Sequence, residues 1–139
     1  MKAPILLALA LSLSACEAAE PTGTLTLACQ GTAQMTSDTG EFYDTGSFTM
    51  GLVVNLTTRT VHGFREQFER EGSEAQLKIT EVKEAILVLH GQMYRNPIMD
   101  ISGFMDRMTG DMTVTATQRP PVVFSKTYTL KCKPTQRMF

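Results

Sequence analysis

The chain has 139 residues, of which 42% are hydrophobic and 19% are charged, and its formal net charge at pH 7 is -1. This length fits one domain, and the composition is that of a globular protein. The near-neutral charge argues against nucleic-acid binding, because nucleic-acid binders usually carry a basic face or stripe.

The first fifteen residues have the features of a secretory signal peptide. Lys2 supplies a positive start, and residues 5–13 form an apolar run that is too short to span a membrane as a helix. The run ends at Leu13-Ser14-Ala15-Cys16, which resembles the bacterial lipobox. The resemblance implies that the leader is removed before Cys16 and that this cysteine carries the lipid anchor. The alternative is an ordinary secretory leader that is cut nearby, with Cys16 incidental.

Residues 16–23 are small and polar and are predicted to be a flexible tether between the lipid and a domain over residues 24–139. Several acyl chains hold a protein firmly, since each buried methylene contributes about 0.8 kcal/mol. Glu17 follows Cys16, a feature that in enteric-type sorting resembles proteins passed on to the outer membrane. We therefore expect an envelope protein that is lipid-anchored, faces the periplasm and resides at the outer membrane.

Cys29 and Cys132 remain once the lipobox has used one of the three cysteines. Cys29 shares an alternating face with Leu25 and Leu27, and Cys132 shares one with Tyr128 and Leu130. Lys126 interrupts the second of these faces and is expected at a rim. Both thiols therefore point inward from the first and last predicted strands. A disulfide between them is expected in an exported protein and requires those two strands to be neighbours. Two free buried thiols or a metal pair are the alternatives.

Period-two alternation, the signature of half-buried strands, recurs along the mature chain. It is clearest over residues 47–56, 76–80, 85–89 and 112–117. Seven or eight short strands with hairpin connections predict an all-β domain, either a small antiparallel barrel or a compact sandwich, with its first and last strands joined by the disulfide. A barrel is preferred because closure removes exposed strand edges.

Two hairpin corners look alike. Asn55 and Asp106 each open a turn, and Gly110 would supply a residue with positive φ where the other corner has Arg59, at a steric cost. Residues 38–46 and 94–97 are predicted to be polar loops. Residues 62–74, with Phe64 and Phe68 four positions apart, are predicted to be a loop or a short helix beside the barrel mouth.

The histidines and methionines are the candidate metal ligands, and each has a simpler structural interpretation. His62 and His90 have no partner at metal-ligand spacing, and a strand-end role is the simpler interpretation of His90. Thioethers select Cu(I), but core packing explains methionines at alternating positions equally well. The methionines concerned are Met93, Met99, Met105, Met108 and Met112.

No serine lies in a Gly-x-Ser-x-Gly elbow. Spacing alone does not show that any carboxylates pair as glycosidases require; the candidates are Glu41, Asp44, Asp100 and Asp106. We therefore expect no enzymatic activity and no cofactor.

Three segments resemble a group of small exported proteins of α-proteobacteria to which no activity is assigned. They are residues 51–64, 101–111 and 130–139. A second similarity, in architecture alone, is to the membrane-anchored inhibitors of c-type lysozyme, which are small β-barrel lipoproteins with a disulfide. Their Ser-Ala-Ser-Gly-x-Arg-Tyr-like inhibitory motif has no counterpart in this chain.

The leading hypothesis is a lipid-anchored, non-catalytic envelope domain that binds another envelope or cell-wall component or has a structural role. One alternative is a carrier of a small apolar ligand in a barrel interior lined by Phe48, Leu52, Leu87 and Val114. The other is an inhibitor of a cell-wall-degrading enzyme, which requires an ordered protruding loop.

Overall fold

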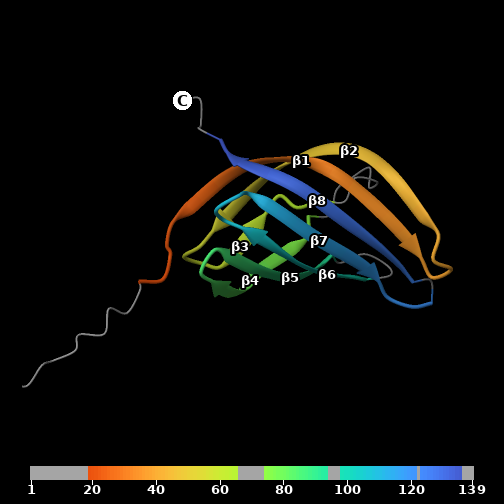
Figure 1. Cartoon of the computed structure of the whole chain (residues 1–139). Helices are drawn as coiled ribbons and strands as arrows, with labels where there is room; N and C mark the ends of the chain where they lie inside the picture. The colour runs from red at the N-terminus through yellow and green to blue at the C-terminus, as the bar shows by residue number, and fades with distance from the viewer. Residues whose placement is uncertain (1–18, 66–73, 94–97, 122, 136–139) are drawn as a thin grey trace, which may run out of the picture.

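The computed structural model describes residues 19–65, 74–93, 98–121 and 123–135, and it is an all-β closed barrel (Figure 1). Each strand is antiparallel to the next in chain order, and the last strand returns to pair with the first. The eight strands are β1 (Thr24–Ser37), β2 (Phe42–Asn55), β3 (Thr60–His62), β4 (Gln76–Lys83), β5 (Ile86–Met93), β6 (Met99–Asp106), β7 (Asp111–Gln118) and β8 (Phe124–Pro134). The predicted all-β class is confirmed, and the choice between barrel and sandwich is decided for the barrel.

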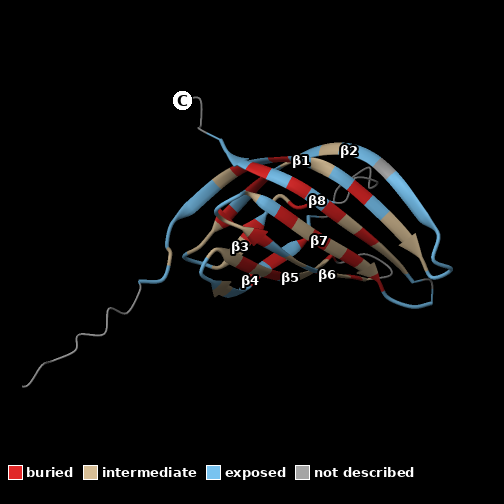
Figure 2. Cartoon of the chain, in the orientation of Figure 1, coloured by how far each residue is buried: buried red, intermediate tan, exposed pale blue. Residues whose placement is uncertain are grey.

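Buried residues alternate with more exposed ones along the strands, as the red bands between tan and blue show in Figure 2. The buried side chains face the barrel interior. The interior is filled by side chains with no water-accessible surface. Leu52, Leu89, Val114 and Tyr128 are each 0% exposed. A void large enough for water would leave accessible area on its lining, so no such void adjoins these four side chains. Tyr128 packs edge-on against the rings of Phe48 and Phe64, each with a centroid separation of 5.2 Å.

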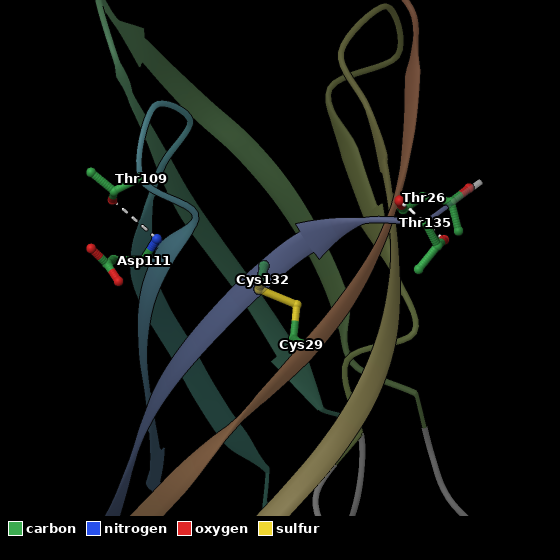
Figure 3. The surroundings of a disulfide bond; sticks show 6 residues. All are labelled: Thr26, Cys29, Thr109, Asp111, Cys132 and Thr135. Carbon is green, nitrogen blue, oxygen red and sulfur yellow. Dashed lines mark hydrogen bonds between the residues drawn. A yellow bond between two sulfur atoms is a disulfide. The ribbon is translucent and has the colours of Figure 1, made fainter.

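The disulfide joins Cys29 of β1 to Cys132 of β8, as predicted (Figure 3). The two residues lie directly opposite each other, with Cα atoms 4.0 Å apart. The Cys132 N–H points away from β1, since it donates to the Gly110 carbonyl at 2.8 Å. This makes the pair one of the non-hydrogen-bonded pairs of an antiparallel ladder, whose side chains approach most closely. The strand register therefore brings the two sulfur atoms together.

The two predicted hairpin corners form as expected. Asn55 accepts the N–H of Thr58 at 2.9 Å, while Asp106 accepts the N–H groups of Met108 and Thr109 at 2.7 and 3.1 Å. Arg59 and Gly110 hold the matching position at each corner, with φ of 55° and 78°. The arginine thus adopts the left-handed conformation that the sequence comparison of the corners predicts.

Two sequence predictions are corrected, and a third is tested only in part. Residues 42–46 were expected to lie in a loop, but they belong to β2. Lys126, expected at a rim, is completely buried, with its Nζ 5.2 Å from the centroid of the Tyr128 ring. Within residues 62–74, Arg65 and Glu74 form an antiparallel bridge and Phe64 is part of the core, whereas residues 66–73 lie outside the described residues.

The strand order gives the barrel two distinct ends. The tether end carries the start of β1, the close of β8 and the β2–β3, β4–β5 and β6–β7 turns. The tip end carries the β1–β2 turn and the β7–β8 connection. In Figure 1 the long β1–β2 hairpin arches over the barrel and ends at the right, while the start of β1 lies at the left. Within the described ranges, no helix has the length and hydropathy needed to cross a membrane.

Candidate binding surface

The tip of the β1–β2 hairpin, residues 37–46, is held in shape by its own hydrogen bonds. Ser37 N–H donates to the Glu41 carbonyl at 3.1 Å, and Gly40 N–H donates to the Ser37 carbonyl at 3.0 Å. Lower on the hairpin, Gly46 N–H donates to Asp44 Oδ1 at 2.9 Å. Gly46 has φ of 81° and lies in a bulge, where the register shifts relative to β1. A bulge bends and twists a strand, so it redirects the tip away from the line of the barrel wall.

Two aromatic side chains project from this hairpin tip. Phe42 is 75% exposed and Tyr43 is 47% exposed. The Tyr43 hydroxyl donates to Glu41 Oε2, and this hydrogen bond raises the pKa of Tyr43 above its usual value of 10.0. Asp38 and Asp44 are also exposed there. The tip therefore combines exposed apolar rings with three carboxylates, and contains no Lys or Arg.

Among the described residues, β2 below the tip has an edge without a strand partner, the open edge. Leu56 N–H donates to the Gly23 carbonyl of the chain leading into β1, at 2.8 Å. This hydrogen bond fixes which residues of β2 direct their N–H and C=O groups toward β1. The N–H and C=O groups of Ser47 and Thr49 consequently point away from β1. Among the described residues, that side of β2 pairs only with β3, through residues 53–55. An unpaired edge is a template on which another chain can add a strand.

The described part of the chain does not include Cys16, so its predicted lipidation stays a prediction. The predicted disulfide pair is present at the position described above. Near the tether end, Glu20 Oε1 lies 2.8 Å from Arg59 Nη2, and Gly23 N–H donates to Thr57 Oγ1 at 3.0 Å. The described end of the predicted tether is therefore fixed to the β2–β3 turn.

The two histidines lie apart. His62 Nδ1 is 3.4 Å from Glu74 Oε1 at the end of β3, while His90 projects from the middle of β5 into an open polar groove across β4–β7. Within residues 19–65, 74–93, 98–121 and 123–135, no three His, Cys, Asp or Glu side chains converge as metal ligands. The groove wall includes the exposed Lys78 beside His90.

The methionines divide into core and surface. Met105 and Met112 are opposite each other on β6 and β7, as their places beside one corner suggest, and both are buried. Met93 and Met99 form a similar buried pair on β5 and β6. Met108 is 83% exposed on the β6–β7 turn. Core packing accounts for the four buried thioethers, while Met108 projects away from them.

The candidate carboxylates are distributed over three separate parts of the barrel. Glu41 and Asp44 lie at the tip, and Asp106 caps a turn at the opposite end. Asp100 accepts hydrogen bonds from Arg119 Nε at 2.6 Å and Nη2 at 2.7 Å, and from Gln92 Nε2 at 3.0 Å. The guanidinium hydrogen bonds, followed by that from Gln92, lower the pKa of Asp100 from 3.8 to about 2.

No family model, curated protein or solved structure matches this chain. The resemblance to small exported proteins of α-proteobacteria consequently stays a prediction.

Sequence reasoning overlooked the hairpin tip and the open edge. Asp44, Thr45 and Gly46 have the composition of a loop, which concealed the continuation of β2 through the bulge. The available signal was the turn sequence Ser37-Asp38-Thr39-Gly40 followed directly by Phe42 and Tyr43.

Proposed function

We propose that this chain is a lipid-anchored protein of the bacterial envelope, held by Cys16 at the outer membrane and facing the periplasm, and that its barrel is a non-catalytic binding module. The observation that carries the binding role is the exposed Phe42–Tyr43 pair at the barrel end opposite the tether. Aromatic residues are enriched at protein interfaces, and two ordered rings on a hairpin lose little side-chain entropy when they are covered.

The chemistry of the surface points to a protein partner with a basic face. Asp38, Glu41 and Asp44 are exposed on the same hairpin tip as the rings, so a surface rich in Lys or Arg is electrostatically complementary. The open edge of β2 can accept an extended segment of the same partner through main-chain hydrogen bonds. Apolar contact at the tip and strand addition below it would form one continuous interface.

A photo-crosslinking side chain introduced at Phe42 in the full-length protein tests this proposal in cells. We expect one discrete crosslinked product from position 42 and none from position 108, where an equally prominent apolar side chain lies at the other end of the barrel. A Cys16→Ala form should lose both the lipid anchor and the product. Crosslinking at both positions, or at neither, would contradict a binding role for the tip.

The open edge is tested separately with Thr49→Lys. An edge lysine opposes strand addition, so yield of the position-42 product should fall several-fold. Gln30→Lys is the matched control, because Gln30 lies opposite Thr49 on β1, which is paired on both sides. If both lysine substitutions lower the yield equally, the added charge and not the open edge explains the effect.

A second candidate function is inhibition of a cell-wall-degrading enzyme, favoured by the ordered acidic hairpin tip. The partner in this case is a basic glycosidase whose cleft receives Phe42 and Tyr43. A turbidity assay with c-type lysozyme distinguishes this case, since the isolated protein should slow lysis and a Phe42→Ser/Tyr43→Ser variant should not. The third candidate, an apolar carrier, has no support from the filled interior positions.

A further inference from the structure

The first described residues leave the barrel with very little free chain. Glu20 pairs with Arg59, Gly23 N–H donates to Thr57 Oγ1, and the Gly23 carbonyl accepts the N–H of Leu56. All three contacts fix the segment to the β2–β3 turn at the tether end. The chain is thus held against the β2–β3 turn from Glu20 onward.

Four peptide units separate the Cα atoms of Cys16 and Glu20, a span of at most about 14 Å when fully extended. If Cys16 carries acyl chains, as the proposed function holds, it lies at the lipid surface. The tether end then has to stay within roughly that distance of the headgroups. We infer that the tether end of the barrel rests on the lipid bilayer, with the β6–β7 turn and Met108 as its apolar contact.

The side chains at this end suit an uncharged lipid surface. Met108 is 83% exposed on a turn that Asp106 holds in place through two backbone N–H groups. Lys83 lies 3.3 Å from Glu81, and Lys131 lies 2.7 Å from Asp111. These two lysines already have carboxylate partners, and a phosphatidylcholine surface tests the apolar contact without the attraction that anionic lipid would exert on the exposed Lys133.

The same geometry directs the hairpin tip away from the membrane. β1 has 14 residues, so its far end lies up to about 45 Å from its start. With the tether end on the bilayer, Phe42 and Tyr43 face the space where an envelope partner is found. The short free chain after Cys16 therefore orients the barrel as well as retaining it at the membrane.

The experiment uses the full-length acylated protein in phosphatidylcholine vesicles, with a fluorophore at Met108→Cys or at Phe42→Cys. Cys29 and Cys132 are joined and Cys16 is acylated, so each variant offers one free thiol. Nitroxide-labelled lipid should quench the label at position 108 at least 2-fold more than the label at position 42. Equal quenching, or stronger quenching at position 42, overturns the inference while leaving the anchored binding module intact.

A protein with a longer free chain after Cys16 is the matched control. Twelve Gly and Ser residues inserted between Glu17 and Ala18 leave every contact of the barrel in place. They extend the free chain to a root-mean-square reach of about 20 Å, so the difference in quenching should fall. If the difference in quenching between positions 108 and 42 is unchanged, the short free chain does not orient the barrel. Absence of acyl groups by mass spectrometry, with failure to float with vesicles, instead overturns the proposed anchoring and the inference together.

Discussion

Arg59 and Gly110 occupy the same position in two hairpin turns but carry different steric costs. Arg59 holds φ of 55° with a side chain, and a left-handed conformation costs a non-glycine residue about 1–2 kcal/mol. At Gly110 a Cβ would lie 2.2 Å from the Cys132 carbonyl oxygen, so only glycine fits there. The β2–β3 turn therefore accommodates a side chain at this position, whereas the β6–β7 turn excludes one.

We expect Arg59→Gly to raise the free energy of unfolding by about 0.5–1 kcal/mol, because relief of the strained φ exceeds the added entropy of the unfolded chain. Its exposed pair with Glu20 contributes too little to reverse the sign. Urea unfolding measures the change. Gly110→Ala should lower stability by more than about 1 kcal/mol, and a loss of stability in both variants would contradict the strain at Arg59.

Asp100 provides a pH test. Its pKa in the folded protein is lowered to about 2, mainly by the hydrogen bonds from Arg119, so the ionised form is favoured by folding. The stability it contributes is present above the ordinary pKa of 3.8 and is lost as the pH falls toward 2. The melting-temperature advantage of the wild type over Asp100→Asn should therefore shrink across that interval.

Carbon NMR of the labelled carboxyl group measures the pKa of Asp100 directly. Arg119→Gln is the control, because it removes the bidentate donor and should return the pKa of Asp100 toward 3.8. A titration midpoint that stays near 2 in this variant would assign the shift to other neighbours.

At the scale of the strands, the disulfide supplies the long-range restraint that the barrel needs. Cys29 and Cys132 are 103 residues apart in sequence, and the strands they join close the sheet. On the chain-entropy model a crosslink of this length stabilises by up to about 4.7 kcal/mol. The wild-type protein should show no free thiol at positions 29 and 132 when it is denatured without reductant.

We expect Cys29→Ala/Cys132→Ala to lower the urea midpoint strongly, by a free energy of about 2–5 kcal/mol. The comparison is with the wild type before and after reduction. If reduction and the double substitution both leave the midpoint unchanged, the closure of β1 on β8 rests on packing and hydrogen bonds alone.

Close approach of strands places a second requirement on β1. A Cβ at Gly31 would lie 1.9 Å from the Thr129 carbonyl oxygen of β8, whereas a Cβ at Gly51 would meet nothing nearer than the Leu27 carbonyl oxygen at 4.0 Å. Gly31→Ala should therefore cost more than about 2 kcal/mol, and Gly51→Ala should be neutral or slightly stabilising. Thermal melts of both variants check the difference, and similar melting temperatures would exclude the clash.

The sequence predicts the strand faces well, because burial on a pleated strand alternates locally with a period of two. Leu52, Leu87 and Val114 lie inside as expected. The two hairpin corners constrain only strands that follow each other in the chain, whereas the cysteine pair constrained the first and last strands to be neighbours. Burial of Lys126 depends on its neighbours Met35 of β1 and Ala116 of β7 as well as on its own strand, so alternation alone placed it on the apolar face without showing that it is buried.

At the scale of the whole molecule, the proposed function separates attachment from recognition. The described part of the predicted tether lies at one end of the barrel, and the exposed aromatic pair lies at the other. A packed interior suits this arrangement, since the wall then serves as a rigid spacer between the two ends. The candidate binding surface was hidden from sequence reasoning because exposure and edge pairing depend on which strands close the sheet.

If the barrel is a solid spacer, apolar ligands should not bind inside it. Saturation at 100 times the dissociation constant stabilises a folded protein by about 2.7 kcal/mol, a shift that a thermal melt detects easily. We expect neither palmitate nor benzene to change the melting temperature of the wild type. Leu52→Ala is the positive control, because removing a fully buried leucine costs about 2–5 kcal/mol and opens an apolar cavity that benzene can fill. A ligand-induced rise in the wild type would show that the interior opens, and would favour the carrier over the spacer.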